Sequence, residues 1–178
     1  PKPPHRRTVN LNTTGRASPY PRGDLFMVFE YMDHDLAGLI NAGYEFSLQQ
    51  IRCLMHQLLE VLDYLHNAKK IMHRDIKTAN LLLSSRTGVL KLADLGLATS
   101  YRTRNVFSTN VVTLWYRSPE LLLGMRNYGP AVDIWSTGII FAELIAKKVF
   151  LQANNEIKQL DQIFRWCGSP AGPGVWSG

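Results

Sequence analysis

Apolar residues recur at steps of three and four between residues 51 and 65, which is the spacing of one face of an α-helix. Ser47 stands just before this stretch with Gln50 three residues later, and such a pair is typical of a capping box at a helix start. The pattern predicts a long amphipathic helix whose apolar face is made of Ile51, Leu54, Met55, Leu58, Leu59, Leu62 and Leu65.

Three other stretches have helical patterns. Residues 131–146 are apolar nearly all round, which is typical of a helix buried in the centre of a domain. Residues 157–164 carry apolar side chains at helical spacing, and a short helical pattern covers residues 36–40. Helices are therefore expected to form most of the fold.

Short apolar runs predict a few strands. Residues 25–29 are apolar and aromatic and are expected to form a buried strand, which a polar linker over 30–35 joins to the rest of the chain. Residues 81–83 and 89–93 flank a turn-rich insert, so they are expected to pair as a hairpin. Helices and a small sheet together indicate an α+β fold.

Length and composition narrow the class of protein. The chain has 178 residues and a mass of 20.2 kDa, which fits one ordinary domain. No apolar run approaches the roughly 18 residues of a membrane-spanning helix, so no membrane association is expected. The two cysteines, Cys53 and Cys167, lie far apart, which argues against a disulfide framework and favours a reducing, intracellular compartment.

The net charge of +6 is concentrated near the start of the chain. Residues 1–24 hold most of the unbalanced positive charge together with several prolines, which predicts a basic, irregular lead-in. A solvated segment is preferred here over a specific anion-binding patch. Direct nucleic-acid binding is not expected, because the lead-in lacks aromatic stacking motifs.

The residues that best indicate chemistry form one cluster, HRDIKTAN at 73–80, termed here the HRD loop. Asp75 could accept a hydroxyl proton, and Lys77 could neutralise charge on a transferring phosphoryl group. Asn80 offers an amide oxygen to a hard cation, and Asp94, directly after the predicted hairpin, could bind the same cation. Such oxygen ligands suit Mg²⁺, which also borrows the phosphates of its substrate.

The order of motifs resembles the signature set of eukaryotic protein kinases: H-R-D-x-K-x-x-N at 73–80, D-x-G at 94–96 and x-P-E at 118–120. The resemblance implies a protein-kinase-like fold, mainly the α-helical C-terminal lobe with the hinge and the last N-lobe strands, and with most of the N-lobe sheet missing. It implies a basic lead-in and partial N-lobe over 1–24, the last N-lobe strand and hinge over 25–35, and a truncated C-lobe over 36–178.

The resemblance also implies roles for single residues. Asp75 would orient or deprotonate the substrate hydroxyl, Lys77 would stabilise the γ-phosphate of ATP, and Asn80 with Asp94 would hold Mg²⁺. Thr113 matches the threonine that bonds to the catalytic Asp and Lys in serine/threonine kinases, which argues against a tyrosine kinase. ATP contacts are implied at Phe29, Glu30, Tyr31, Met32, Asp35, Leu82 and Asp94.

The run WYRSPELLLG at 115–124 resembles the cyclin-dependent kinase family. In that family the equivalent of Arg117 holds the backbone at Val112, which implies substrates with Ser-Pro or Thr-Pro sites, such as the RNA polymerase II tail. Stretches such as 34–39 and 88–94 are most similar to its cyclin-T-partnered, transcription-elongation branch, followed by the cyclin-K-partnered relatives. The resemblance implies a T- or K-like cyclin as partner of the full-length protein, a role in transcription and a nuclear location.

Regulatory and structural residues are implied as well. Ser108 falls where the family carries its activating phosphorylation, with Thr109 as the alternative, and Arg74 is the expected partner of the phosphate. A second arginine expected by the family pattern is Thr99 here, so Arg102 or Arg104 are substitutes. Two acidic residues, Glu120 and Asp133, are expected to have structural roles, with Asp133 bracing the HRD loop.

The resemblance runs from about residue 7 to residue 176 and covers the middle of a kinase domain. The Gly-rich loop, the lysine and the helix that clamp ATP are not found before residue 25, so a truncated gene model or partial transcript is expected, and this chain alone is expected to be inactive. Two functions stay open: an ATP-dependent serine/threonine kinase, and a catalytically inactive kinase lobe that acts as an interaction module.

Overall fold

The computed structural model describes residues 26–102 and 106–169. The chain divides into two units, residues 1–31 and residues 32–178, and each is described by itself. The boundary falls inside the segment predicted as strand and hinge, and the predicted domain limits stay a prediction. The basic lead-in over residues 1–24 and Arg104 lie outside the described residues. Among the described helices, none has the length and apolar character needed to cross a membrane.

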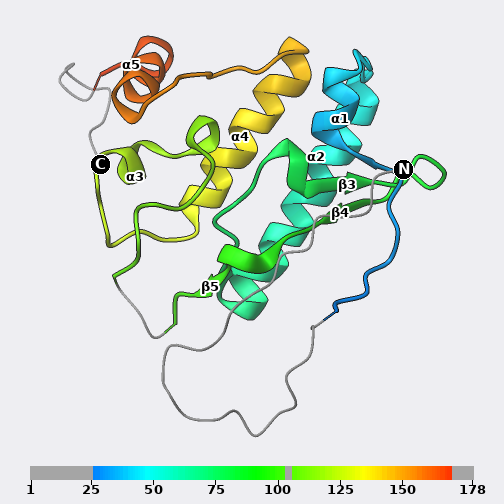
Figure 1. Ribbon diagram of the computed structural model, residues 1–178, viewed down its shortest axis with the longest axis horizontal. Coiled ribbons are helices and arrows are strands. Elements are labelled where there is room, and N and C mark those ends of the chain that lie inside the picture. Colours follow the sequence, from blue (N-terminus) through cyan, green and yellow to red (C-terminus); the bar gives the residue numbers. More distant parts are fainter. Residues whose placement is uncertain (1–25, 103–105, 170–178) are drawn as a thin grey trace, which may run out of the picture. The chain divides into compact units, whose positions relative to one another are not determined.

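The second unit is built on two long helices that lie side by side, α2 (Leu48–Asp63) and α4 (Ala131–Ala146) (Figure 1). The predicted capping box is present at the start of α2: Gln50 N donates to Ser47 Oγ at 3.2 Å, and Ser47 N donates to Gln50 Oε1 at 2.8 Å. The helix continues as a π-helical turn over Tyr64–Lys69. The long amphipathic helix predicted from the apolar spacing is thus confirmed.

Helix α4 has the predicted bounds but not the predicted burial. Val132 and Ile140 are fully buried, whereas about half of the surface of Ile134, Phe141 and Ile145 is exposed. The exposed residues are seven and four positions apart and share one face of the helix. Only the side that packs on α2 and the short turns beside it is covered, so the prediction of a helix buried all round is wrong for the opposite side.

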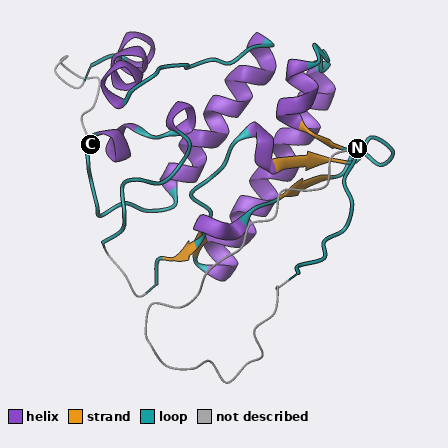
Figure 2. Ribbon diagram, in the orientation of Figure 1, coloured by secondary structure: helices purple, strands orange, loops and turns teal. Residues whose placement is uncertain are grey.

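Shorter helices complete the second unit. Helix α1 (Leu36–Asn41) lies near the hairpin, and α3 (Pro119–Leu122) contacts α5 (Glu156–Cys167). The described part of this unit also contains three single turns of 3-10 helix: Thr78–Asn80, Leu95–Leu97 and Leu114–Tyr116. Figure 2 shows how helix dominates over the short strands.

The strands form two small antiparallel sheets. One has the order β1 (His34–Asp35), β3 (Leu81–Leu83) and β4 (Leu90–Leu92), and the other pairs β2 (Ile71–Met72) with β5 (Thr99–Ser100). Leu81 lies opposite Leu92, so the predicted hairpin is confirmed. Strand β4 also packs on α2, which holds the hairpin against the helical layer (Figure 1).

The predicted strand over residues 25–29 is not found. Phe26–Phe29 form no strand, and each of these side chains is at least 70% exposed. An apolar run becomes a strand only when a neighbouring strand accepts its backbone hydrogen bonds and an apolar layer covers one face. Neither is provided within the described part of this unit, so the high apolar content alone was misleading.

Candidate functional site

Three of the predicted site residues surround the carboxylate of a fourth, Asp75 in the HRD loop. Lys77 Nζ donates to Asp75 Oδ2 at 2.8 Å, and Asn80 Nδ2 donates to the same oxygen at 3.1 Å. Thr113 Oγ1, from a segment 38 residues later, donates to Asp75 Oδ1 at 3.1 Å. Lys77 Nζ also lies 3.3 Å from Thr113 Oγ1. The structure therefore brings Asp75, Lys77, Asn80 and Thr113 together.

These contacts decide the charge of Asp75. Burial alone would raise the pKa of this carboxyl group, but the ammonium of Lys77 and the hydrogen bonds from Asn80 and Thr113 outweigh that effect. The pKa of Asp75 is consequently below its ordinary value of 3.8. Near neutral pH the side chain is a carboxylate with hydrogen bonds on both oxygens.

His73 stabilises the HRD loop in its neutral form. Asp75 N donates to His73 Nδ1 at 3.2 Å, so Nδ1 is an acceptor and the ring proton is on Nε2, which lies 3.1 Å from the carbonyl oxygen of Ala93. Burial lowers the pKa of His73, which favours this neutral tautomer. The histidine thus links the HRD loop to the end of β4.

Asp133, at the start of α4, anchors the same loop. Its Oδ1 accepts from Arg74 N and its Oδ2 from His73 N, both at 2.8 Å. His66 Nε2 lies 2.8 Å from Oδ2 and supplies a third partner. The carboxylate is 1% exposed, so its hydrogen bonds replace water completely. Sequence analysis missed His66, because nothing in its spacing from the loop indicates a contact.

Left-handed backbone conformations occur at two residues around the loop. Arg74 has a φ of 64° and Val112 a φ of 63°, and this region is strained for a β-branched residue such as valine. Val112 N donates to Arg74 O at 3.0 Å, and Arg117 Nη2 donates to Val112 O at 3.1 Å. The backbone of Val112 is therefore held from both sides. Arg117 also pairs with Glu156 at the start of α5.

Asp94 directly follows Ala93, whose backbone is hydrogen-bonded to Asn80. Ala93 N donates to Asn80 O at 2.9 Å, and Asp94 follows with a φ of 63° and an exposed side chain. Both amide protons of Asn80 point to Asp75, to its Oδ2 and to its carbonyl oxygen, so Asn80 Oδ1 is left as an acceptor.

An amide oxygen and a carboxylate near each other fit a Mg²⁺ ion, which needs few protein ligands when phosphates supply the others. Within the described residues there is no cluster of three or more His, Cys, Asp or Glu side chains arranged for a metal ion. The metal roles of Asn80 and Asp94 stay a prediction.

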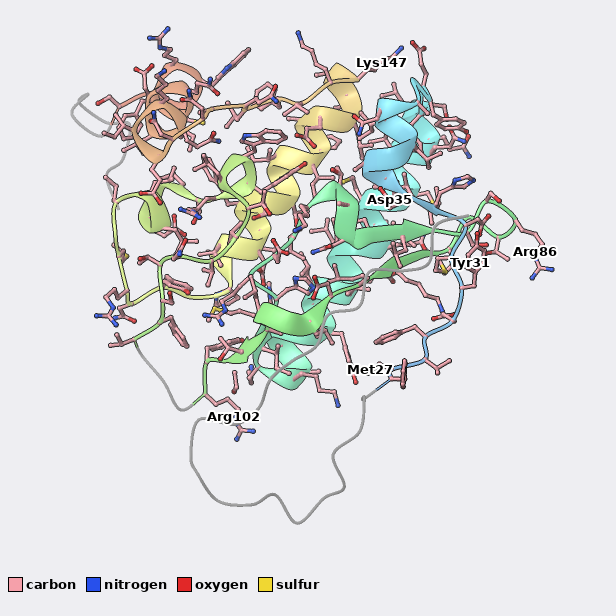
Figure 3. The ribbon with its side chains drawn as sticks, in the orientation of Figure 1. Met27, Tyr31, Asp35, Arg86, Arg102 and Lys147 are labelled. Carbon is pink, nitrogen blue, oxygen red and sulfur yellow. The ribbon has the colours of Figure 1, made fainter. Side chains whose placement is uncertain are left out.

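The predicted nucleotide contacts divide between the two units. Asp35 lies opposite Leu82 in the pairing of β1 with β3, and Asp35 Oδ1 accepts from Gly38 N at 2.7 Å, which caps α1. Figure 3 shows Asp35 where β1 passes into α1. Met32 is the first residue of the second unit and is partly buried. The remaining predicted contacts, Phe29, Glu30 and Tyr31, are exposed and belong to the first unit.

The predicted phosphorylation site, Ser108, follows a residue that is anchored in the core. Ser108 is exposed, whereas the adjacent Phe107 is buried against the ring of Tyr128 at a centroid distance of 5.2 Å. Tyr128 OH donates to Ser108 O at 2.6 Å and accepts from Arg74 Nη1 at 3.2 Å. Arg74 therefore reaches the segment around Ser108 through Tyr128, a residue that sequence analysis did not identify.

Three other residues around this segment have simpler surroundings. Thr109 is partly buried, and Arg102 is exposed with its backbone N–H near Ser100 Oγ. Thr99, which stands where an arginine was expected, pairs with Met72 in the small second sheet. The alternative phosphate-binding role of Arg102 stays a prediction.

Glu120 and Ser118 extend the site at the start of α3. Glu120 is partly buried, and its carboxylate has no ion-pair partner within the described residues. Ser118 is fully buried, and its hydroxyl is without a hydrogen-bond partner there. The expected structural role of Glu120 is therefore not explained by a contact in the described part of the chain.

Comparisons with known proteins agree with this geometry. The protein kinase domain family matches residues 5–171. Cyclin-dependent kinase C-1 of Arabidopsis thaliana is 54% identical over 153 residues, which are 84% of this chain and 30% of that protein. Cyclin-dependent kinase 9 of Danio rerio is 46% identical over 186 residues, which are 98% of this chain and 49% of that protein.

A solved structure is similar in fold as well as in sequence. The crystal structure of the yeast RNA polymerase II CTD kinase CTDK-1 complex contains a chain that is 44% identical, with a TM-score of 0.76 over 80% of this chain and 47% of that one. The chain thus spans half or less of the proteins it matches. The predicted fold class is confirmed, and the chain belongs to the protein kinase domain family, in which cyclin-dependent kinases are among its relatives.

Proposed function

We propose that this chain carries the catalytic loop of an ATP-dependent serine/threonine protein kinase. The single observation that supports the proposal most strongly is the carboxylate of Asp75, which receives hydrogen bonds from Lys77, Asn80 and Thr113. A structural salt bridge needs only one cation and one carboxylate. Here three polar side chains from two segments converge on one buried acid, as a site for phosphoryl transfer requires.

The hydrogen bonds around Asp75 leave free the lone pairs and the ammonium proton that the reaction needs. Asp75 Oδ1 carries one hydrogen bond from Thr113 and retains lone pairs that can accept the substrate hydroxyl proton. The Lys77 ammonium has three protons, of which two point to Asp75 and Thr113, so the third can stabilise the γ-phosphate. Asn80 and Asp94 would hold Mg²⁺, which neutralises charge on the β- and γ-phosphates when it is bound.

A preference for proline after the phosphorylated residue is supported by Val112. Arg117 already donates to the carbonyl oxygen of Val112, so this oxygen is not free to accept the N–H of the next substrate residue. Most residues would leave that N–H without a partner, whereas proline has none to satisfy. Substrates with Ser-Pro or Thr-Pro sites therefore fit this segment best.

The names of the relatives support a proposal on partners and cellular role. Because similar proteins are named cyclin-dependent kinases, and one solved relative is a kinase of the RNA polymerase II tail, we infer that the full-length protein binds a cyclin, phosphorylates that tail and acts in the nucleus. The resemblance of residues 34–39 and 88–94 makes a T- or K-like cyclin the preferred partner. Co-purification of the full-length protein with cyclin T and with cyclin K, each expressed separately, distinguishes the two partners. Recovery of neither cyclin would contradict the partner proposal.

The function is tested in the full-length protein with its cyclin, by transfer of the γ-phosphate from ATP to a Ser-Pro repeat peptide in the presence of Mg²⁺. Activity is expected to fall by about 10³-fold in Asp75→Asn, because the carboxylate that accepts the hydroxyl proton is lost. A matched peptide with tyrosine in place of serine is expected to remain unmodified. A folded chain without any transfer in the presence of the cyclin would favour the alternative of an inactive lobe that acts as an interaction module.

A further inference from the structure

A buried polar chain connects the HRD loop with helix α4, and none of the roles proposed above uses it. Thr78 Oγ1 lies 3.0 Å from Tyr116 OH, and Tyr116 OH donates to Glu143 Oε2 at 2.9 Å. All three residues are at most 5% exposed. Because tyrosine has one hydroxyl proton, which is directed to Glu143, Thr78 is the donor to Tyr116.

Two members of this polar network, Thr78 and Tyr116, lie next to residues of the site. Thr78 follows Lys77 directly and begins the single turn that ends at Asn80. Tyr116 closes the turn after Thr113, since Tyr116 N donates to Thr113 O at 2.9 Å. The hydrogen bond between Thr78 and Tyr116 thus joins the two segments that meet at Asp75.

Helix α4 provides the fixed end. Ser136 Oγ donates to Tyr116 O at 2.8 Å, and Glu143 lies seven residues later, two turns along the same helix. Glu143 Oε1 has no hydrogen-bond partner among the described residues, and Tyr116 is the side chain that donates to this buried carboxyl group, beside the backbone N–H of Phe150. Removal of the tyrosine hydroxyl would therefore leave Thr78 without this acceptor and Glu143 without its side-chain donor.

Other charged groups near Glu143 do not take over this role. A cavity of about 90 Å³ lies beside Glu143 and is also lined by Glu45 and Lys147. These two residues pair with each other at 2.6 Å and are more than half exposed. Figure 3 shows Lys147 at the end of α4, and the Glu45 pair holds its ammonium there.

We propose that Tyr116 and Glu143 are positioning residues, which act through Thr78 on the turn that carries Lys77 and Asn80. The proposal rests on the proposed function, because a position matters only if Lys77 and Asn80 take part in a reaction. The physical reason is that the hydroxyl groups of Thr78 and Tyr116 are buried and depend on these hydrogen bonds, so the bonds to Glu143 on α4 favour one position of the turn.

The test is hydrogen exchange of the backbone amides of residues 78–81 in the full chain without nucleotide, followed by mass spectrometry. Thr78→Val keeps the shape of the side chain and removes the hydroxyl, whereas Thr78→Ser keeps the hydroxyl. Exchange in this segment is expected to be about tenfold faster in Thr78→Val and in Tyr116→Phe, and within about twofold of the native rate in Thr78→Ser.

The matched control is Thr137→Val. Thr137 is also buried, but its hydroxyl donates only to Asp133 O within the same helix, so exchange in residues 78–81 is expected to stay unchanged. Thr78→Val alone decides the test if Tyr116→Phe does not fold. Exchange in Thr78→Val that stays within about twofold of the native rate would overturn the proposal, because the opening of this turn would not depend on the hydroxyl.

An activity measurement then separates positioning from stability. In the transfer assay, Thr78→Val is expected to reduce kcat about tenfold at saturating ATP while Thr78→Ser restores it, and a merely structural role would lower the folded fraction without that split. Because the exchange measurement needs no catalysis, it decides the positioning role even where this chain transfers no phosphate, and failure of the proposed function stays distinguishable from failure of this inference.

Discussion

The two predicted ligands of the cation are held in different ways. Asn80 is 7% exposed and lies in a loop that Asp133 anchors through the backbone of His73 and Arg74. Asp94 is exposed, and its Oδ1 accepts a hydrogen bond from Gly96 N, two residues later, at 3.1 Å. The next residue, Leu95, is also 59% exposed, although its position in the D-x-G motif is apolar by type.

This difference shows that packing in the core determines the position of Asn80. Local backbone geometry determines the position of Asp94. One tie between them is Arg74 Nε, which donates to Leu97 O at 2.8 Å. Segments with few buried contacts open at low free-energy cost. We therefore expect substitutions in the HRD loop to change stability, and substitutions around Asp94 to change binding of the cation.

The largest effect on stability is expected for Asp133→Asn. The amide group would turn a donor toward Arg74 N, His73 N or His66, and a buried donor would lose its acceptor, at a cost of about 3 kcal/mol in the free energy of unfolding. Chemical denaturation of the full chain measures this change. The control is Asp161→Asn, since Asp161 pairs with Arg165 on the surface of α5 and should contribute less than about 0.5 kcal/mol. Equal losses in both variants would contradict the anchoring role of Asp133.

Asp94→Asn tests the exposed one of the two predicted cation ligands. The free energy of unfolding is expected to change by less than about 0.5 kcal/mol, because the side chain is exposed. The Mg²⁺ concentration for half-maximal phosphate transfer is expected to rise about tenfold, because a charged ligand becomes neutral. Asp63→Asn, at an exposed carboxylate on α2, is the control. An unchanged Mg²⁺ requirement in Asp94→Asn would exclude Asp94 as a ligand.

Arg117→Lys tests the segment that joins the loop to the substrate side. Lysine has one ammonium group and cannot hold Val112 O and Glu156 with the forked geometry of arginine. The ratio of transfer to Ser-Pro and Ser-Ala peptides is expected to fall about fivefold, since the freed carbonyl oxygen can accept the N–H of alanine. Arg165→Lys on the exposed face of α5 should leave the ratio unchanged. A ratio that does not fall would remove Arg117 from the explanation of proline preference.

The smallest effect is a pH dependence of stability from Glu143. Burial raises the pKa of Glu143 above its ordinary value of 4.5 and outweighs the hydrogen bond from Tyr116. The folded chain therefore retains a proton that the unfolded chain releases, so the free energy of unfolding decreases as the pH rises from 4.5 toward the pKa of the folded state.

Glu143→Gln is neutral at every pH and should lack this decrease. Thermal unfolding at a series of pH values, for the native chain and the variant, measures the difference. The nearby Glu45 and Lys147 are present in both proteins, as is Tyr116, so their titration cancels. Parallel curves for the two proteins would contradict a neutral Glu143.

Some elements could be predicted because their causes are local. The capping box at Ser47 and the apolar spacing after it define α2, and the turn residues at 84–88 define the β3–β4 hairpin. The strand predicted over 25–29 was wrong because strand formation depends on a partner that the run itself does not contain. The exposed face of α4 was missed for the same reason, since burial is a property of neighbours.

The candidate site shows the same division. The order of polar residues in the HRD loop identified Asp75, Lys77 and Asn80, because their side chains have the donors and acceptors that phosphoryl transfer needs. His66, Tyr128 and Glu143 could not be identified in this way. Tyr128 and Glu143 contact the site from distant parts of the chain, and His66 contacts it through Asp133, so a single histidine, tyrosine or glutamate has no spacing that reveals such a contact.

The amino-acid sequence alone was sufficient for the kinds of chemical group at the site, because motif order and side-chain chemistry are written along the chain. Folding was needed to set their protonation and their positions. Asp75 is ionised because Lys77, Asn80 and Thr113 surround it, and the left-handed backbone at Val112 persists because Arg74 and Arg117 hold it. Charge and strain depend on what lies within a few ångströms, and that proximity exists only after the distant segments have packed on α4.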